Sequence, residues 1–367
     1  MGFKCGIVGL PNVGKSTLFN ALTRTAAAQA ANYPFCTIEP NTGEVAVPDP
    51  RMKLLAQAGK SKEIIPTRIS FVDIAGLVRG ASKGEGLGNK FLANIREVDA
   101  VVHVLRCFED SDITHVEGRI DPVGDADTIE TELMLADLES IERRLEQTRK
   151  RAASKDKESL TVLPVMEEVV KLLQDGKPAR LLLKTLPPEE IAILKGLNLL
   201  TSHPVLYVCN VAEGDAATGN SFTAQVEKMA KDQGAECVII SAAIEAEVAQ
   251  LPDEESQEFL AALGLEEAGL DRLIRAGYHL LDLITYFTVG PKETRAWTIK
   301  RGTKAPAAAG VIHSDFERGF IRAQTIAYED YIALGGEVGA KEAGKARDEG
   351  KEYVVQDGDV LMFKFNT

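Results

Sequence analysis

The sequence predicts an α/β fold, in which a doubly wound, mostly parallel sheet carries a helical-hairpin insertion and is followed by a smaller α+β domain. From residue 3 to about 245, short β-like runs alternate with helical stretches, an order typical of helices covering a parallel sheet. From about 127 to 198 this alternation stops. After Gly277 a series of short strand-like runs begins. The strand candidates of the first part are Cys5–Val8, Ile69–Asp73, Ala100–Leu105, Val205–Cys209 and Cys237–Ser241.

The composition is that of an ordinary globular chain. Its 367 residues leave room for two domains, and 45% hydrophobic and 26% charged residues can bury a core. No apolar run is long enough to span a bilayer, and we see no signal peptide, so we expect a cytoplasmic protein without a membrane partner. The five cysteines are scattered and are expected to be reduced core residues. The net charge of −13 argues against indiscriminate nucleic-acid binding, so we expect no DNA partner.

The first strand candidate leads into a phosphate-binding loop. Residues 9–16 read Gly-Leu-Pro-Asn-Val-Gly-Lys-Ser, and a predicted helix follows, which is the setting that this motif requires. Lys15 supplies a cation to the β- and γ-phosphates, and we count it as catalytic; the Ser16 hydroxyl can ligate Mg²⁺. The loop glycines and the helix N-terminus direct backbone N–H groups at the phosphates. We therefore expect a nucleoside triphosphate to contact Asn12, Val13, Gly14, Lys15, Ser16 and Thr17.

Two further segments complete the predicted phosphate and Mg²⁺ site. Residues 73–76 have the form D-x-x-G and end the second strand candidate. Asp73 can hold Mg²⁺ through water, and the Gly76 N–H, which we count as catalytic, can meet the γ-phosphate. The glycine-rich stretch that follows is suited to ordering by a γ-phosphate. Upstream, Thr37 is the hydroxyl expected to complete Mg²⁺ coordination, with Thr25 and Thr42 as alternatives.

The interruption at 127–198 predicts an antiparallel helical hairpin that projects from the sheet domain. Apolar residues recur there at roughly helical spacing on both sides of a polar link, Arg149–Glu158. We place Pro164 in the first turn of the second helix, where a missing N–H costs nothing. Residues 143–157 carry seven basic and two acidic side chains, a local charge of +5. This segment is either an RNA-binding surface or an ordinary solvated helix end.

The motif that should read the base is altered. Asn210-Val-Ala-Glu213 stands where a guanine-specific protein carries Asn-Lys-x-Asp, whose aspartate accepts from guanine N1–H and the 2-amino group. Here the lysine is missing and the carboxylate is one methylene longer. A carboxylate would repel N1 of adenine, so we expect the Asn210 amide and the Val211 backbone to read the base, with Ser241 and Ala242 closing the pocket. Losing a charged hydrogen-bond pair costs about 1.5–3 kcal/mol, so the motif predicts ATP over GTP.

The segment from 282 to 365 is expected to form a small mixed sheet. The stretch Gly335–Gly350 is expected to be an exposed loop or a frayed helix. Basic residues in this segment add a second candidate surface for structured RNA. The predicted strands are Thr285–Val289, Arg295–Ile299, Ile321–Ala327, Glu352–Val355 and Val360–Phe365.

Taken together, these motifs resemble Obg-related GTPases of the translation-factor type, and within them the YchF family. The similar segments are residues 9–20, 32–41, 73–88 and the C-terminal part, so the resemblance covers nearly the whole chain. It implies a P-loop NTPase domain over 1–281 with the insertion at about 127–198, and a β-grasp TGS domain over 282–365. It also implies a ribosome-associated ATPase. TGS domains are similar to modules of threonyl-tRNA synthetases, which favours a ribosome, ribosomal RNA or tRNA partner.

Three residues bear on the rate of hydrolysis. Leu77 occupies the position where many switch GTPases carry a glutamine that orients water, so we expect slow intrinsic hydrolysis. His115 could swing in as a polar catalytic group, or it could be a plain surface histidine. Asn12 is suited to ligate K⁺ as well as to contact nucleotide, as the resemblance to potassium-dependent relatives suggests.

The sequence leaves three other functions open. One is a GTP-specific switch of the same fold, and another is a metabolic phosphotransferase, although no lid for a second substrate is evident. The third is a passive RNA-binding adaptor in which the nucleotide is only structural. The motifs favour a Mg²⁺-dependent ATPase switch that binds the ribosome.

Overall fold

The computed structural model describes residues 3–30, 41–74, 87–110 and 119–366, and its chain separates into two compact units. The first unit consists of Phe3–Gly43 and Ser70–Gly277. The second consists of Glu44–Ile69 together with Tyr278–Thr367. Within the described part of the chain, none of the helices has both the length and the apolar character needed to cross a lipid bilayer.

The first unit is built on a six-stranded sheet with the order β2-β4-β1-β5-β6-β7. β1 pairs in parallel with both β4 and β5, and β6 continues the parallel pairing between β5 and β7. β5 and β6 are buried along their whole length, because their continuous apolar runs are covered on both faces. The predicted doubly wound α/β fold is confirmed. The strands are β1 (Lys4–Val8), β2 (Thr42–Ala46), β4 (Arg68–Asp73), β5 (Ala100–Arg106), β6 (Val205–Asn210) and β7 (Glu236–Ile240).

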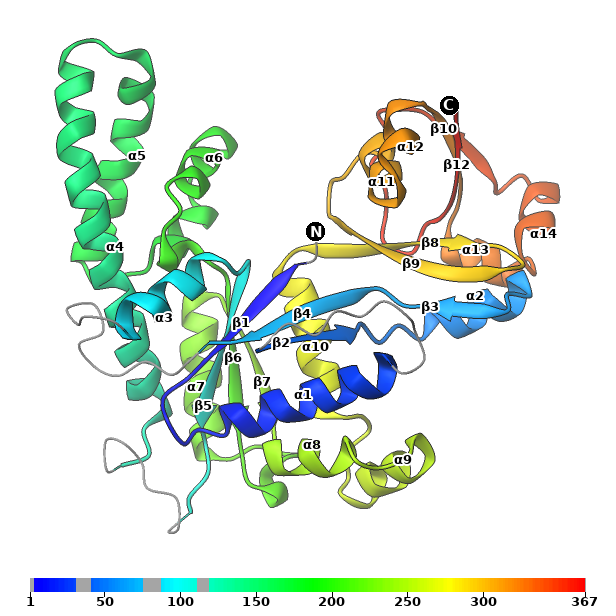
Figure 1. The fold of residues 1–367 in the computed structure, drawn as a ribbon, viewed down its shortest axis with the longest axis horizontal. Coiled ribbons are helices and arrows are strands. Elements are labelled where there is room, and N and C mark those ends of the chain that lie inside the picture. Colours follow the sequence, from blue (N-terminus) through cyan, green and yellow to red (C-terminus); the bar gives the residue numbers. More distant parts are fainter. Residues whose placement is uncertain (1–2, 31–40, 75–86, 111–118, 367) are drawn as a thin grey trace. The chain divides into compact units, whose positions relative to one another are not determined.

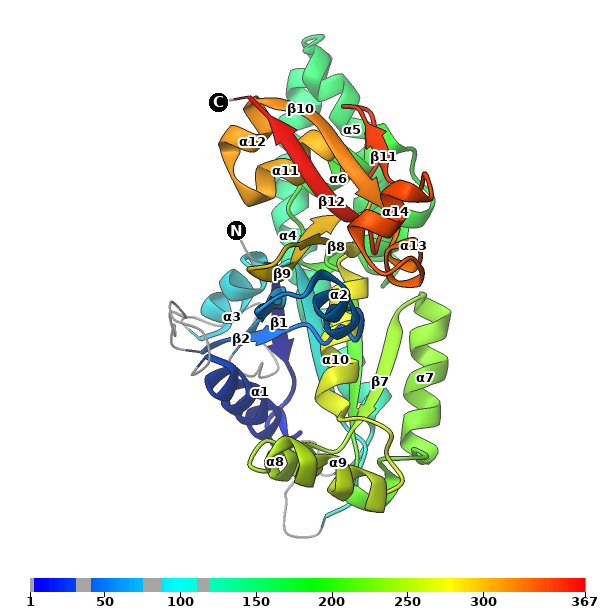
Figure 2. The same cartoon turned by 90° about the vertical axis from the view of Figure 1, so that its right-hand side faces the viewer.

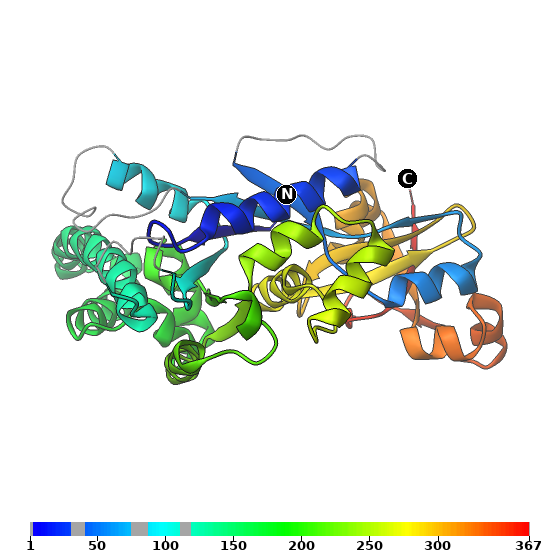
Figure 3. The ribbon, with the colours of Figure 1, turned by 90° about the horizontal axis from the view of Figure 1, so that it is seen from below.

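Helices connect these strands and begin at recognisable caps. α7, for example, starts after Asn220, whose side chain accepts from the N–H groups of Phe222 and Thr223, and it ends at Gly234 with φ 62°. α1 packs against α8 within this unit (Figure 3). The helices outside the insertion are α1 (Lys15–Ala30), α3 (Leu87–Arg96), α7 (Ser221–Gln233), α8 (Ala242–Val248), α9 (Asp253–Ala262) and α10 (Gly269–Leu280).

Two long helices, α4 (Pro122–Ala153) and α5 (Lys157–Gln174), project from the sheet as an antiparallel pair, which we call the helical arm (Figure 1). Asp121 caps the first by accepting from the Gly124 N–H at 3.0 Å, and Asp156 caps the second. Shorter helical segments return the chain to β6. These are η1 (Ala179–Lys184), α6 (Pro188–Gly196) and η2 (Leu200–Ser202).

The position of Pro164 differs from the prediction. It lies inside α5 rather than in its first turn, because the helix already begins at Lys157 behind the Asp156 cap. The carboxylate of Asp156 accepts from both the N–H and the hydroxyl of Ser159, at 2.9 and 2.6 Å. A strong cap upstream therefore outweighs the preference of proline for a first turn.

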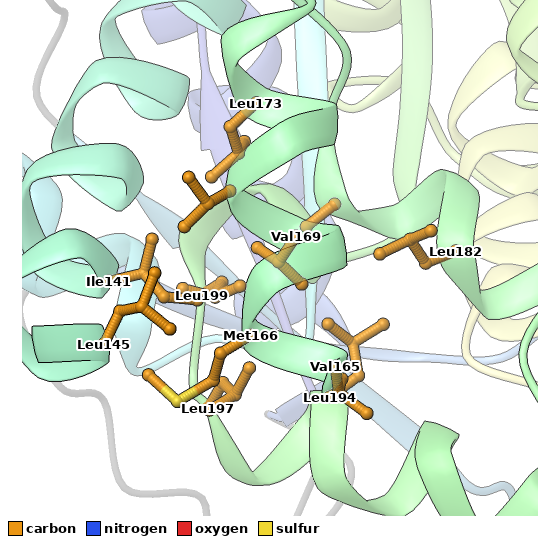
Figure 4. Packing of buried hydrophobic residues seen from close by; sticks show 12 residues of the cluster. Ile141, Leu145, Val165, Met166, Val169, Leu173, Leu182, Leu194, Leu197 and Leu199 are labelled. Carbon is orange, nitrogen blue, oxygen red and sulfur yellow. The ribbon is translucent and has the colours of Figure 1, made fainter. Parts of the chain in front are cut away.

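The arm has its own apolar core (Figure 4). Ile141 and Leu145 from α4 meet Met166 and Val169 from α5, and Leu194 of α6 joins the same cluster. Each of these side chains is at most 5% exposed. A leucine-to-alanine change in such a core costs roughly 2–5 kcal/mol, so the arm is a packed element and not a loose extension.

The second unit contains another six-stranded sheet, with the order β11-β10-β12-β8-β9-β3. β8 pairs with β9 in antiparallel and with β12 in parallel orientation, and Figure 2 shows β10 and β12 beside each other. α11 and α12 pack on this sheet. Its elements are α2 (Arg51–Gly59), β3 (Glu63–Ile65), β8 (Leu283–Val289), β9 (Glu293–Lys300), α11 (Ala305–Ile312), α12 (Ser314–Arg318), β10 (Phe320–Ile326), α13 (Tyr328–Ala333), α14 (Glu337–Glu342), β11 (Arg347–Glu349) and β12 (Val360–Phe365).

This unit departs from the sequence expectations in three places. The segment 44–69 contributes α2 and β3, and β3 pairs in parallel with β9, a contact across more than two hundred residues of chain. The predicted strand at 352–355 is wrong: only Val354 makes an isolated bridge there. The short edge strand is instead β11, inside the stretch 335–350 that was expected to be a loop or frayed helix. Such pairing depends on distant partners, which local pattern does not reveal.

A buried histidine in β5 is expected to make the stability of the protein pH-dependent. His103 is 3% exposed beside the ring of Tyr207, and burial together with the nearby charge of Arg180 lowers its pKa from 6.5 to about 3. Between pH 6.5 and 3 the unfolded chain binds a proton that the native state does not. The free energy of unfolding should therefore fall as the pH drops through this window, by about 1.4 kcal/mol per unit.

Urea unfolding of the wild type and of His103→Gln at pH 7, 6 and 5 measures this effect. The variant lacks the titrating group, so its free energy of unfolding should fall less steeply between pH 6.5 and 5. Over this interval the fall should be about 2 kcal/mol smaller in the variant than in the wild type. Equal slopes for the two proteins would contradict the assignment. Carboxylates titrate in both proteins alike and cancel in the difference.

Candidate nucleotide-binding site

The glycine-rich loop lies between β1 and α1, at the carboxyl edge of the parallel sheet. Two of its glycines are required by close contacts. A Cβ on Gly9 would lie 2.8 Å from the Val104 carbonyl oxygen. At Gly14, where φ is +92°, a Cβ would lie 2.1 Å from Nδ2 of Asn210. The loop can therefore approach its neighbours only because these positions carry no side chain.

Lys15 and Asp73 are neighbours, although they are 58 residues apart in sequence. The ammonium group of Lys15 donates a hydrogen bond to Oδ1 of Asp73, and the two side chains are 12% and 21% exposed. β1 and β4 run side by side in register, which carries the ends of both strands to the same place. The cation predicted for the phosphates and the carboxylate predicted for Mg²⁺ thus lie at one site.

Asn210 joins three loops. Its Nδ2 donates to the Val13 carbonyl at 2.9 Å, and its Oδ1 accepts from the Ala242 N–H at 2.9 Å. The residue is only 5% exposed. The side chain therefore connects the end of β6 to the glycine-rich loop on one side and to the start of α8 on the other. Losing it would leave a buried carbonyl and a buried N–H unpaired.

This geometry changes the expected roles of Asn210 and Val211. The Val211 N–H, which was expected to help read the base, donates instead to the Ile240 carbonyl at 2.8 Å. The amide of Asn210 is engaged with both neighbouring loops. Polar contacts of these residues with a base remain open to the Val211 carbonyl, to the second N–H of the Asn210 amide and to the second lone pair of its oxygen.

A pocket of about 1060 Å³ opens beside this bridge. Asp73 and Val13 are not among its lining residues. Asp73 instead accepts a hydrogen bond from Lys15, which lines the pocket, and the Val13 carbonyl accepts one from Asn210. The hydroxyl of Ser241 is buried and has no hydrogen-bond partner among the described residues. The predicted residues that line the pocket are Asn12, Gly14, Lys15, Ser16, Thr17, Asn210, Val211, Glu213, Ser241 and Ala242.

One wall of the pocket was not predicted from the sequence. Phe108, Glu109 and Asp110 line it, directly after β5. Arg106, which is 1% exposed, holds this wall by donating to the Phe108 and Asp110 carbonyls at 3.2 Å each. Its guanidinium also lies 4.7 Å from the centroid of the Phe108 ring. The signal for this wall was available, because β5 is a parallel strand whose carboxyl end must share the edge with the other motifs.

Some predicted residues lie outside the described part of the chain. Thr37, expected to ligate Mg²⁺, is one of them, and so are Gly76, Leu77 and His115. Among the described residues, no three or more histidine, cysteine, aspartate or glutamate side chains are grouped so that they could hold a metal. Mg²⁺ does not need such a group, because it commonly binds through one or two protein oxygens together with substrate phosphates and water.

The chain matches known protein families along most of its length. Residues 4–163 match a family described as "50S ribosome-binding GTPase", and residues 283–366 match the YchF GTPase C-terminal family, described as "Protein of unknown function (DUF933)". The chain is 60% identical over 366 residues to a protein of Haemophilus influenzae named "Ribosome-binding ATPase YchF". It is 55% identical over 368 residues to the Bacillus subtilis protein of that name, and in both cases all of each chain is covered.

A solved structure agrees with these matches. The Schizosaccharomyces pombe YchF GTPase superposes with a TM-score of 0.89 at 40% sequence identity, covering 99% of this chain and 98% of the other. The P-loop geometry described above and the full-length identity to these relatives point the same way. The chain belongs to the YchF family of P-loop nucleoside triphosphatases.

Proposed function

We propose that this protein is a Mg²⁺-dependent ATPase switch that binds the ribosome and works in the cytoplasm. The carrying observation is the pocket that gathers the glycine-rich loop, Lys15 and the altered base motif at one edge of the sheet. Two relatives that are 55% and 60% identical to this chain over its full length are named ribosome-binding ATPases, and this supports the ribosome as partner. Ribosomal RNA is the part of that partner expected to meet basic surfaces, and tRNA is the other candidate.

The preference for ATP depends on the base motif. Glu213 lines the pocket and is exposed, in a short helical turn after β6. The guanine-specific motif Asn-Lys-x-Asp binds guanine with a lysine and an aspartate. Here Val211 replaces that lysine, and the longer Glu213 replaces that aspartate. The alternative is a GTP-specific switch, which is favoured by the word GTPase in the description of the matching domain and in the name of the related Schizosaccharomyces pombe protein. Phosphate release measured with ATP and GTP at equal concentrations, with and without purified ribosomes, separates the two.

Restoring the guanine motif should reverse the preference. In the double variant Val211→Lys, Glu213→Asp, the ratio of the Kd for GTP to that for ATP is expected to fall by about 10- to 100-fold, since a charged hydrogen-bond pair is regained. Competition of both nucleotides against a fluorescent analogue gives the ratio. Glu213→Ala is the control, and its affinity for ATP should change little because the carboxylate does not grip adenine. An unchanged ratio in the double variant would count against this account of selectivity.

The residues around the phosphates fit Mg²⁺. Ser16 lines the pocket, and the Asp73 carboxylate lies beside Lys15, so two hard oxygen donors lie near the loop that is proposed to hold the β- and γ-phosphates. Thr37 is proposed as a further ligand. When bound, the ion would offset charge that develops on the phosphate oxygens. Asn12, with φ 64° in the loop, is the residue proposed to meet K⁺.

Hydrolysis should be slow until the partner completes the site. Leu77 cannot orient water, and His115 and the Gly76 N–H are the groups proposed to act in catalysis with the partner bound. The Lys15 ammonium would stabilise charge on the transferred phosphoryl group. Stimulation of ATP hydrolysis by purified ribosomes is the expected sign of this dependence.

The tip of the helical arm is the basic surface proposed to meet RNA. Residues 143–157 carry a net charge of +5, of which two charges are offset by the ion pairs of Arg149 with Glu167 and of Arg143 with Glu139. Lys150, Lys155 and Lys157 are exposed, and the described chain offers them no ion pair. Phosphate contacts of this kind make binding steeply salt-dependent, so ribosome affinity should fall as ionic strength rises.

A further inference from the structure

Charge is divided sharply along α4. Residues 120–142 contain eight acidic side chains and no lysine or arginine, whereas residues 143–157 contain seven basic and two acidic ones. The arm therefore has an acidic root and a basic tip. A surface that meets RNA would be expected to carry positive charge only, so the root calls for a separate explanation. The eight acidic residues are Asp121, Asp125, Asp127, Glu130, Glu132, Asp137, Glu139 and Glu142.

Internal structure accounts for most of these acids: Asp121 caps α4, Glu139 pairs with Arg143, Glu142 accepts from the Gln174 side chain at 3.1 Å, and two more hold the arm to its neighbours. Asp137 is 1% exposed and accepts from the N–H groups of Leu200 and Thr201 and from the Thr201 hydroxyl, at 2.7–2.8 Å. Glu130 accepts two hydrogen bonds from Arg180, at 2.8 and 2.9 Å. These carboxylates hold the arm to the rest of the unit.

A cavity of about 410 Å³ lies at the root of the arm, and we call it the arm-root cavity. Its apolar lining comes from Met134, Leu135 and Leu138 of α4 and from Leu173 of α5. Leu135 is 44% exposed, so its side chain is accessible from outside the cavity. The apolar lining of a small cavity with an exposed leucine is the kind of surface that a partner side chain covers.

The charged residues that line the cavity are all acidic. Asp127 and Glu130 line it, and no basic side chain does so among the described residues. Arg180, which is 8% exposed, donates from its two terminal nitrogens to Glu130 and to the Gln233 side chain, the latter at 3.0 Å, and does not pair with Asp127. Burial, Glu130 and Asp121 raise the pKa of Asp127. Asp127 is an exposed residue, and its carboxylate has no hydrogen bond or ion pair among the described residues.

We propose that the arm-root cavity docks a basic segment of a ribosomal protein, with a lysine or arginine side chain entering between Asp127 and the leucines of α4. This inference rests on the ribosome binding proposed above. The aliphatic stem of such a side chain would lie on Leu135 and Leu138, and its cationic head would meet Asp127. An RNA backbone is excluded from the same place by like charge. The arm thus meets protein at its root and RNA at its tip.

Site-specific photo-crosslinking tests the identity of the occupant. The full-length protein carries benzoylphenylalanine at Leu135 and is mixed with purified ribosomes, and the adducts are mapped. We expect adducts with lysine- or arginine-rich peptides of a ribosomal protein. The matched control is Leu160 of α5, an apolar residue that is 50% exposed near the basic tip. It should not react with the same peptides.

Co-sedimentation of the unmodified protein with ribosomes keeps the two proposals apart. If the unmodified protein fails to sediment with ribosomes, the proposed function itself fails, and the docking inference falls with it. If it sediments, but Leu135 reacts with RNA, with acidic or neutral peptides, or with nothing, only the docking inference is overturned.

A charge reversal gives a second, independent measurement. Asp127→Lys should weaken ribosome binding about tenfold or more, because it places a cation where the partner's cation is expected. Glu168→Lys, on the exposed surface of α5 outside the cavity, makes the same change in net charge and should leave the affinity unchanged or raise it. Equal effects of the two variants would refute a specific site. Circular dichroism establishes that both variants keep the helical arm.

Discussion

Replacing Lys15 by alanine is expected to lower the rate of ATP hydrolysis by about 10²- to 10³-fold while leaving the fold intact. The ammonium group is the cation of the glycine-rich loop and already lies against Asp73 at the site. Its removal takes away a cation that stabilises the charge on the phosphoryl oxygens, and this stabilisation is strongest in the transition state. Steady-state phosphate release, together with nucleotide binding, measures the loss and divides it between binding and turnover.

Lys228→Ala is the matched control for this experiment. Lys228 is exposed on α7 of the same unit and does not line the pocket, so its replacement should leave hydrolysis unchanged. A Lys15→Ala protein that hydrolyses ATP at the wild-type rate would mean that the loop does not act on the phosphates. If ribosome binding also stayed the same in the inactive variant, the protein would be a passive adaptor and not a switch.

Gly14→Ala should disable the pocket by a different route. The new Cβ would lie 2.1 Å from Nδ2 of Asn210, and the backbone at φ +92° does not suit an L side chain. Asn210 cannot withdraw without releasing the Val13 carbonyl and the Ala242 N–H. We expect a loss of about 1–3 kcal/mol in the free energy of unfolding and a fall of more than about tenfold in nucleotide affinity.

A second glycine in the same pocket supplies the control. Gly214 also lines the pocket, but a Cβ there would have no atom within 4 Å. Gly214→Ala should therefore keep both stability and affinity, as measured by urea unfolding and by titration with a fluorescent nucleotide analogue. If the two alanine variants behaved alike, the close contact between Gly14 and Asn210 would not be what the loop requires.

Local pattern was sufficient for most of the first unit. The continuous apolar runs that end at Val8, Asp73 and Asn210 form parallel strands, because they are covered on both faces. Helical spacing on either side of a polar link correctly predicted the arm, since α4 and α5 bury a shared apolar stripe. Pattern failed where a distant partner decides the structure. β3 is a strand because it pairs with β9, and the residue types at 63–65 do not by themselves predict that pairing.

The pocket shows the same division. Its predicted lining came from motifs whose residue types are dictated by phosphate chemistry, such as Lys15 and Ser16. Phe108 carries no such motif, and its place in the wall follows from Arg106, which holds the loop after β5 by its carbonyls. Asn210 was recognised as a site residue, but its part in bracing two loops depends on atoms contributed by Val13 and Ala242.

The sequence by itself therefore determined the α/β class, the phosphate-binding loop, the departure from the guanine motif and the resemblance to the YchF family. These are local properties, because they depend on the spacing and type of residues close together in the chain. Only the tertiary structure decided that 44–69 joins the C-terminal sheet, that Asn210 ties three loops together, and that the root of the arm encloses an acidic cavity. Each of these depends on contacts between residues far apart in sequence, and such contacts exist only once the chain has packed.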